Sequence, residues 1–194
     1  MADPAIKQDR VYTYGDYRTW PDDERWELIE GTAWNMSPAP MRSHQAISGE
    51  LFLKIRSHVG NEGCKVYAAP FDVLLPAIGE IEEDDVTSVV QPDISVICDP
   101  EKLTDKGCTG APDLVVEILS PSTSKKDFNN KMALYEKHGV REYWIVDPGN
   151  KFVHVYLLND NKEYPETPEI YLGNAVVPCA VLEDLKIDLS RVFV

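Results

Sequence analysis

The chain has 194 residues, of which 43% are hydrophobic and 27% are charged, a composition typical of a globular protein long enough to bury a core. Its 33 acidic residues against 19 basic ones give a formal net charge of −14. Because non-specific DNA affinity comes mainly from lysine and arginine, this charge argues against a protein that coats DNA. Contact with nucleic acid would need a local basic patch, a bound metal or a partner.

The N-terminal residues contain no apolar signal-peptide core, and no uncharged apolar run of about 18 residues occurs. We therefore expect a cytoplasmic protein without membrane contact. The four cysteines have neither CxxC pairing nor the spacing of a zinc site, and we expect them to be reduced core thiols. They are Cys64, Cys98, Cys108 and Cys179.

The start of the chain predicts a flexible polar arm over residues 1–13, followed by a single domain over residues 14–194. Tyr14–Thr19 is expected to form a short helix that ends before Pro21.

Two short strands, Arg25–Ile29 and Thr32–Met36, are predicted to form a hairpin around Glu30-Gly31. Glu30 and Glu27 on this hairpin are interpreted as solvent-facing charges, although Glu27 could face a site.

The longest predicted helix follows Ser37–Pro40, with Ser43 as its N-cap. His44, Ile47, Leu51, Ile55 and Val59 share one face of this helix at intervals of three or four residues. A histidine at the start of such a stripe usually packs and bonds locally. The alternative is a general acid or a phosphate contact, since a helix N-terminus favours anions. Spacing alone favours the packing interpretation.

Strands are predicted over residues 64–69 and 71–75, and the acidic stretch over residues 77–88 is interpreted as a solvated loop because it lacks the ligand spacing of an EF-hand. The next short apolar strand, Gln91–Ile97, has Asp93 near its start. Residues 99–112 are expected to form a loop.

Leu114–Leu119 is an apolar run between turn signals, which predicts a strand buried on both faces. Glu117 interrupts this run. A buried carboxylate is costly unless a cation or hydrogen-bond donors satisfy it, so Glu117 is expected to have a partner.

The following helix is predicted to start at Ser124 as N-cap, with Asp127 as a capping-box acid, and to stop at Gly139. Phe128, Met132 and Tyr135 mark its packed face, and Lys131 borders that face. From about two turns into the helix, the long side chain of Lys131 can reach back to the strand end that carries Glu117.

The C-terminal third predicts a hairpin of Arg141–Val146 and Phe152–Leu158, an irregular or edge-like stretch over residues 162–172, and a helical turn near Ser190. Exposed apolar residues over Phe152–Tyr156 suggest a homodimer interface. The order of elements gives the fold class: α/β or α+β, with a central mixed sheet flanked by helices and additional β-hairpins.

Asp93, Glu117 and Lys131 together suggest a metal site. Two carboxylates suit Mg²⁺ or Mn²⁺, and a lysine can orient or help to deprotonate an attacking water. The alternative is a buried ion pair that fixes the helix against the sheet. Two acids with one lysine leave an excess of negative charge, and this excess favours the metal.

An ordered series of motifs runs along the chain. Its members are Glu27–Gly31, Met36–Pro40 with His44, Pro92-Asp93, Ala111–Thr123, Asp127 with Lys131 and Tyr135, and Gly139–Pro148. With this series the chain, from about Tyr14 to its end, resembles a large bacterial nuclease family formerly classed as a domain of unknown function. That family belongs to the restriction-endonuclease-like PD-(D/E)XK superfamily.

The resemblance implies a restriction-endonuclease-like fold and a Mg²⁺-dependent (or Mn²⁺-dependent) hydrolase of phosphodiester bonds. Asp93 and Glu117 take the motif's acidic positions, and the carbonyl of Ile118 would be a further metal ligand. The motif's lysine position holds Leu119. The resemblance therefore points to a lysine from the following helix, and Lys131 fits.

Lys125 and Lys126 are expected to face water at the frayed start of that helix. In this family context His44 gains weight as a phosphate contact or proton relay, with Glu27 below it.

Three functional classes remain open: a metal-dependent endonuclease acting on nucleic acid, most simply DNA; a catalytically inactive module that binds a protein; and a hydrolase of small phosphate compounds.

Overall fold

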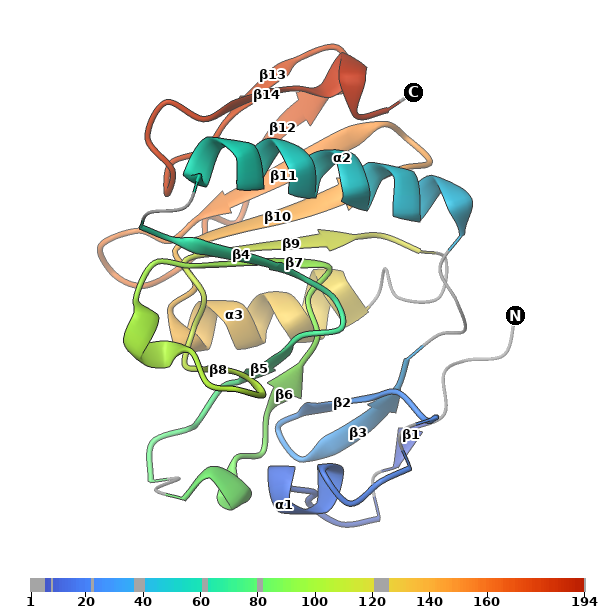
Figure 1. Ribbon diagram of the computed structural model, residues 1–194, viewed down its shortest axis with the longest axis vertical. Helices are drawn as coiled ribbons and strands as arrows, with labels where there is room; N and C mark the ends of the chain where they lie inside the picture. Colours follow the sequence, from blue (N-terminus) through green and yellow to red (C-terminus); the bar gives the residue numbers. More distant parts are fainter. Residues whose placement is uncertain are drawn as a thin grey trace.

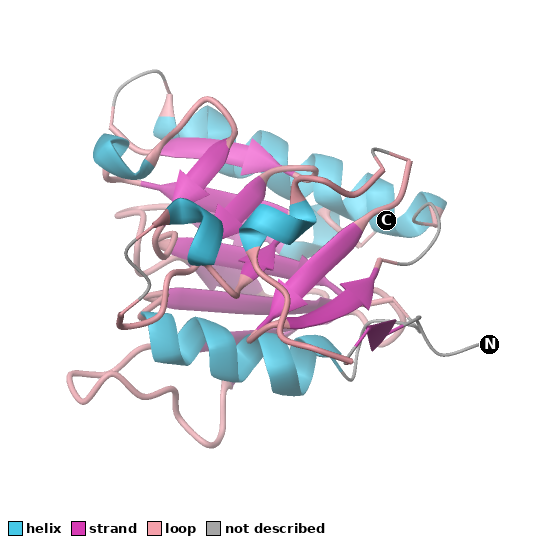
Figure 2. Ribbon diagram, turned by 90° about the horizontal axis from the view of Figure 1, so that it is seen from below, coloured by secondary structure: helices cyan, strands magenta, loops and turns pink. Residues whose placement is uncertain are grey.

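The structure is a computed structural model (Figure 1), and it describes residues 6–7, 9–21, 23–36, 41–60, 63–79, 82–120 and 126–193. Its described part contains two six-stranded mixed sheets and a two-stranded ribbon. Helices lie on both sides of the strands (Figure 2). This arrangement matches the predicted fold class, a mixed sheet flanked by helices with additional hairpins. None of the described helices has the length and apolar character needed to span a lipid bilayer.

Two of the three hydrophobic cores found among the described residues cover the two faces of the sheet that we call the central sheet. In spatial order its strands are β12 (Glu169–Leu172), β11 (Phe152–Leu157), β10 (Glu142–Asp147), β9 (Leu114–Ile118), β7 (Ile94–Ile97) and β4 (Lys65–Ala68). β9 and β10 are parallel, and the other pairs are antiparallel.

Both faces of β9 are covered, as its apolar run predicts. Leu114, Val116 and Ile118 pack in one core with residues of α2 (Arg42–Val59), whereas Val115 packs in another with residues of α3 (Met132–His138). Because side chains alternate along a strand, Glu117 points to the same side as Val115. The strand thus turns its one carboxylate toward α3.

The second sheet begins with the predicted hairpin. In spatial order its strands are β1 (Ile6–Lys7), β3 (Thr32–Asn35), β2 (Trp26–Ile29), β6 (Val89–Val90), β5 (Asp72–Leu74) and β8 (Gly107–Thr109). Glu30 and Gly31 both have positive φ, as a two-residue hairpin turn requires. Ile6–Lys7, in the predicted arm, pairs with β3.

Short elements complete the chain. They are α1 (Tyr14–Tyr17), the 3₁₀ turns η1 (Glu83–Asp85), η2 (Pro100–Lys102) and η4 (Leu189–Arg191), the π-helix η3 (Lys126–Lys131), and the ribbon of β13 (Val176–Pro178) and β14 (Lys186–Asp188). The strands β6, β8, β13 and β14 were not predicted, because each has at most three residues and so carries little hydrophobic periodicity. The stretch predicted as irregular or edge-like contains β12, which is an edge strand of the central sheet.

Two helix starts differ from the prediction. α2 is capped by Met41 and not by Ser43, and the side chain of Met41 makes no capping hydrogen bond. The helix after β9 begins as the π-helix Lys126–Lys131, which no local pattern predicts. The predicted N-cap Ser124 lies outside the described residues.

The strand expected at a homodimer interface is not exposed. β11 lies between β10 and β12, and Val153, Val155 and Tyr156 are buried within the chain. The exposed apolar side chains nearby belong instead to the edge strand β12, where Ile170 is 54% and Leu172 61% exposed. The homodimer itself stays a prediction.

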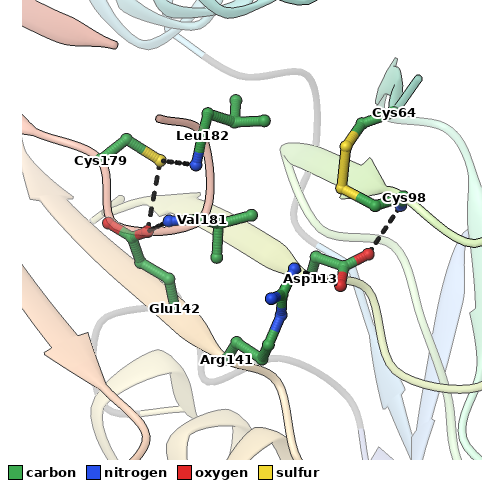
Figure 3. Close-up of a disulfide and its surroundings, with 8 residues drawn as sticks. All are labelled: Cys64, Cys98, Asp113, Arg141, Glu142, Cys179, Val181 and Leu182. Atoms are coloured by element: carbon green, nitrogen blue, oxygen red, sulfur yellow. Dashed lines mark hydrogen bonds and ion pairs between the residues drawn. A yellow bond between two sulfur atoms is a disulfide. The ribbon is translucent and has the colours of Figure 1, made fainter. Parts of the chain in front are cut away.

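The prediction of four reduced cysteines is wrong for two of them. Cys64 and Cys98 form a disulfide that joins the start of β4 to the end of β7 (Figure 3). Strand pairing places them together, since Lys65 is opposite Ile97. Cys108 and Cys179 are free and buried. Disulfides are rare in reducing compartments, and the cytoplasmic location stays a prediction.

Candidate active site

The side chain of Lys131 is held between two buried carboxylates. Its Nζ lies 2.7 Å from Oε1 of Glu117 and 2.8 Å from Oε1 of Glu27. The side chains of Lys131, Glu117 and Glu27 are 3%, 5% and 0% exposed. The predicted partner of Glu117 is therefore present, and the interpretation of Glu27 as a solvent-facing charge is wrong. All four residues of β2, Glu27 included, are buried.

Lys126 also reaches this cluster and forms an ion pair with Oε2 of Glu27. It is 8% exposed, so the expectation that it faces water is also wrong. The π-helix gives the reason. Residues five apart are about 140° apart around an α-helix, whereas the i→i+5 bonding of a π-helix brings them onto one side. Lys126 and Lys131 can then both face Glu27. Lys125 lies outside the described residues.

Tyr135 and Asp127 complete the buried cluster. The hydroxyl of Tyr135 donates a hydrogen bond of 2.7 Å to Oε1 of Glu117, and burial raises the pKa of this phenol well above its usual value. A carboxylate oxygen of Asp127 lies 3.9 Å from Nζ of Lys131. The sequence analysis predicts Asp127 as a capping-box acid. Its spacing of four residues from Lys131 is the sequence feature that indicates their contact.

Asp93 and His44 form a second pair at the same strand end. Nε2 of His44 lies 3.2 Å from Oδ2 of Asp93, and this oxygen also accepts a 2.7 Å hydrogen bond from the backbone N–H of Ile118. The side chains of His44 and Asp93 are 14% and 20% exposed, more than those in the buried cluster around Lys131. Burial alone would lower the pKa of His44, but the hydrogen bond and charge of Asp93 raise it above the usual value. The packing interpretation of His44 is therefore incomplete.

The buried cluster around Lys131 has more carboxyl groups than ammonium groups. It contains the carboxylates of Glu27, Glu117 and Asp127 against the ammonium groups of Lys126 and Lys131, all at most 8% exposed. Burial, helped by the neighbouring carboxylates, raises the pKa of Glu117 to about 8 despite Lys131. Burial also acts on Glu27, but its two lysines prevail and lower its pKa to about 2. The pKa of Lys131 is raised well above its usual value, because its carboxylates outweigh burial.

Carboxylate and carbonyl oxygens, the donors that Mg²⁺ and Ca²⁺ prefer, lie at this strand end. Within the described residues, no three side chains of histidine, cysteine, aspartate or glutamate are grouped as metal ligands. Mg²⁺ is usually bound by one or two carboxylates and keeps several waters, so it does not need such a group. The carboxylates of Asp93 and Glu117, with the carbonyl of Ile118, fit this requirement. Because burial raises the pKa of Glu117 to about 8, a bound cation would stabilise its ionised form.

A cavity of about 270 Å³ opens beside His44. Met41, Ser43, Leu119 and Asp147 contribute to its lining. Leu119, which occupies the motif's lysine position, therefore supplies apolar surface next to the site. The cavity leaves room for a ligand at the N-terminal end of α2.

Comparisons with known proteins agree with this architecture. The chain is 26% identical over 152 residues to an uncharacterized protein of Synechocystis sp. named slr1290, covering 77% of this chain and 75% of that protein. The crystal structure of a putative nuclease belonging to DUF820 from Anabaena variabilis superposes with a TM-score of 0.72, at 24% identity, over 93% of this chain and 97% of that one. This structural likeness confirms the fold.

A family model described as "Putative restriction endonuclease", the Uma2 family, matches residues 14–190. This match covers the central sheet, both larger helices and every residue of the two clusters described above. The predicted resemblance to restriction-endonuclease-like nucleases is thereby confirmed, and the chain belongs to the Uma2 family of putative restriction endonucleases.

Proposed function

We propose that this chain is a metal-dependent nuclease that hydrolyses phosphodiester bonds of nucleic acid, with DNA as the substrate. The observation that carries the proposal is the placement of Lys131 against the buried carboxylate of Glu117, beside Asp93 at the same end of the central sheet. A buried ammonium next to excess carboxylate is a costly arrangement for stability alone. It is suited to a site where a cation and a phosphate meet.

Asp93, Glu117 and the carbonyl of Ile118 are the residues that would hold Mg²⁺ or Mn²⁺. A divalent ion there would supply Lewis-acid chemistry, the activation of a water and the polarisation of a phosphoryl oxygen. Asp93 is kept in position by the N–H of Ile118 and by His44. Glu117 is kept in position by Tyr135 and Lys131.

Lys131 acts as an ammonium in this proposal. Because its pKa is raised, it keeps its proton, so it orients the attacking water and stabilises developing negative charge instead of removing a proton. Glu27 is a positioning residue. Its two oxygens bind Lys126 and Lys131 separately, and the backbone N–H of Gln91 donates a 3.0 Å hydrogen bond to Oε1.

His44 is the proposed contact to the scissile phosphate. It lies in the first turn of the 18-residue helix α2, where free backbone N–H groups favour an anion. Its raised pKa increases the imidazolium fraction near neutral pH, so it can donate a proton to the leaving oxygen. The cavity beside it, whose lining also includes Ser43 and Ser120, gives the phosphate room to reach the imidazole.

The test has two stages. Calorimetry of Mg²⁺ and Mn²⁺ binding compares the wild type with Asp93→Ala and Glu117→Ala, and we expect both variants to lose binding. Cleavage of labelled single- and double-stranded DNA and RNA is then followed with Lys131→Met as the catalytic variant. Lys137→Met, an exposed lysine on α3, is the matched control.

The nuclease proposal fails if the wild type cleaves none of these substrates with either metal present. Hydrolysis of a small phosphate ester in place of the polymers would identify the small-phosphate hydrolase. Metal binding without hydrolysis of any phosphate compound would indicate a protein of the family that has lost catalysis.

A further inference from the structure

A second cleft, of about 430 Å³, lies where the end of β4 meets β5 and β8, at the boundary of the two sheets. Tyr67 and Phe71 line it, and their rings stack on each other with centroids 4.2 Å apart and planes 3° from parallel. Both rings are half-buried. The cleft therefore offers a flat aromatic surface that is partly open to solvent.

One wall of the cleft is a fixed polar network. Nε2 of Gln91 donates hydrogen bonds to Oδ1 of Asp72 at 2.8 Å and to the hydroxyl of Tyr17 at 3.2 Å, while Oε1 of Gln91 accepts one from Arg25 at 2.7 Å. The hydroxyl of Tyr17 also donates to Oδ1 of Asp72. All these bonds to Asp72 use Oδ1, so Oδ2 keeps its capacity to accept a hydrogen bond from a ligand.

The same network touches the candidate active site. The backbone N–H of Gln91 bonds Glu27, and the backbone N–H of Ala69, between the two stacked rings in sequence, donates a 3.1 Å hydrogen bond to the carbonyl of Asp93. A group bound in the cleft would thus lie beside the backbone that carries Asp93. This placement suits a part of the substrate that neighbours the scissile phosphate.

The charges of the cleft indicate which part of the substrate it takes. Asp72 and Asp105 oppose Lys106, so the lining has more carboxylate than ammonium and repels a phosphate. An aromatic platform stacks on any base, and a carboxylate accepts a hydrogen bond from an exocyclic amino group. In a duplex, the faces of a base are stacked on its neighbours and its amino group is paired. The ligand that fits the cleft is therefore an unpaired or extruded base.

We propose that this cleft binds an unpaired nucleobase bearing an exocyclic amino group, such as cytosine or adenine, next to the phosphodiester to be cleaved. Tyr67 and Phe71 supply the stacking surface, and Asp72 accepts the amino hydrogen bond. The proposal rests on the proposed nuclease function for its substrate. The binding of the free base is testable without any cleavage.

The first experiment titrates the whole protein with cytidine and with uridine and follows protein amide NMR signals. We expect cytidine to shift signals around Phe71 and Asp72 and uridine to bind more weakly. Phe71→Leu should weaken cytidine binding about fivefold to a hundredfold, the usual loss when a base-stacking ring is removed. Asp72→Asn should remove the preference for cytidine over uridine.

Phe152→Leu is the matched control, because Phe152 belongs to another stacked pair, with His154 at 4.7 Å, away from the cleft. Thermal unfolding of each variant separates a loss of binding from a loss of folding. The subsite is overturned if cytidine shifts no signals at the cleft, or if Phe71→Leu and Phe152→Leu bind cytidine equally well while folded.

The second experiment measures cleavage of a single-stranded DNA oligonucleotide by wild type and Phe71→Leu. A rise in KM with kcat retained supports the subsite, and equal KM values overturn it. The two proposals fail in different ways. Cytidine bound at the cleft with no cleavage of any substrate contradicts the nuclease alone, whereas cleavage without nucleoside binding contradicts the subsite alone.

Discussion

The ammonium nitrogen of Lys131 lies 2.7 Å from Oε1 of Glu117 at a place where neither side chain is more than 5% exposed. A buried ion pair of this kind contributes little net stability when intact, but losing one partner leaves an uncompensated buried charge. The first two predictions follow from this asymmetry.

Lys131→Met should lower the free energy of unfolding by about 3–5 kcal/mol, because Glu27 and Glu117 then lose their shared cation. Urea denaturation followed by circular dichroism measures this loss. Lys137→Met is the control, since Lys137 pairs with Glu30 where both side chains are more than half exposed, and it should cost less than about 1 kcal/mol. Equal losses in the two variants would contradict a buried role for Lys131.

Glu117 should make the metal-free protein less stable as the pH rises. Its pKa is about 8 in the folded chain against an ordinary value of 4.5, so the folded state holds the proton more tightly. The resulting stabilisation is complete below pH 4.5 and is lost as the pH rises through 8.

The measurement is urea unfolding in EDTA at several values between pH 5 and 9, for wild type and Glu117→Gln. The wild type should lose stability relative to the variant by at most about 1.4 kcal/mol per pH unit, the limit for one proton. A constant difference across this range would refute the raised pKa.

The number of reactive thiols tests the disulfide between Cys64 and Cys98. With Cys64 and Cys98 joined, the unfolded but unreduced protein should present two reactive thiols, and reduction should give four. Burial raises the pKa of Cys108 to about 11 and that of Cys179 to about 12, so at pH 8 both remain thiols in the folded chain. Alkylation at pH 8 should therefore be slow until denaturant is added. Four thiols before reduction would show that the disulfide does not form.

Glu142 on β10 should hold the C-terminal ribbon to the central sheet. Its Oε2 accepts hydrogen bonds of 2.9 Å from the N–H groups of Ala180 and Val181, of which Figure 3 draws Val181. Its Oε1 accepts one from the indole of Trp144. Glu142→Gln should cost about 1–3 kcal/mol, because an amide group cannot accept at both ends.

Hydrogen exchange should show faster exchange of the Ala180 and Val181 amides in Glu142→Gln. Glu166→Gln, a change at an exposed position, is the control and should leave both amides and the unfolding free energy unchanged. Unchanged exchange in Glu142→Gln would remove Glu142 from this role.

Much of the fold follows from local patterns. The apolar run of β9 and the Glu30-Gly31 turn each come from a few adjacent residues, and the stripe of α2 follows the helical period of 3.6 residues. Neighbouring residues define all three by themselves. The same locality made Glu117 conspicuous, since a carboxylate in a doubly covered strand needs a partner. Lys131 was within reach because it follows only 14 residues later.

The sequence by itself therefore determined the type of fold, its family and the reach of Lys131 toward the strand that carries Glu117. The tertiary structure decided the rest of the site. Glu27 meets Lys126 across 99 residues of chain, and Cys64 meets Cys98 through strand register. No local period encodes such contacts, because they depend on which strands become neighbours and on a π-helical turn that only packing selects.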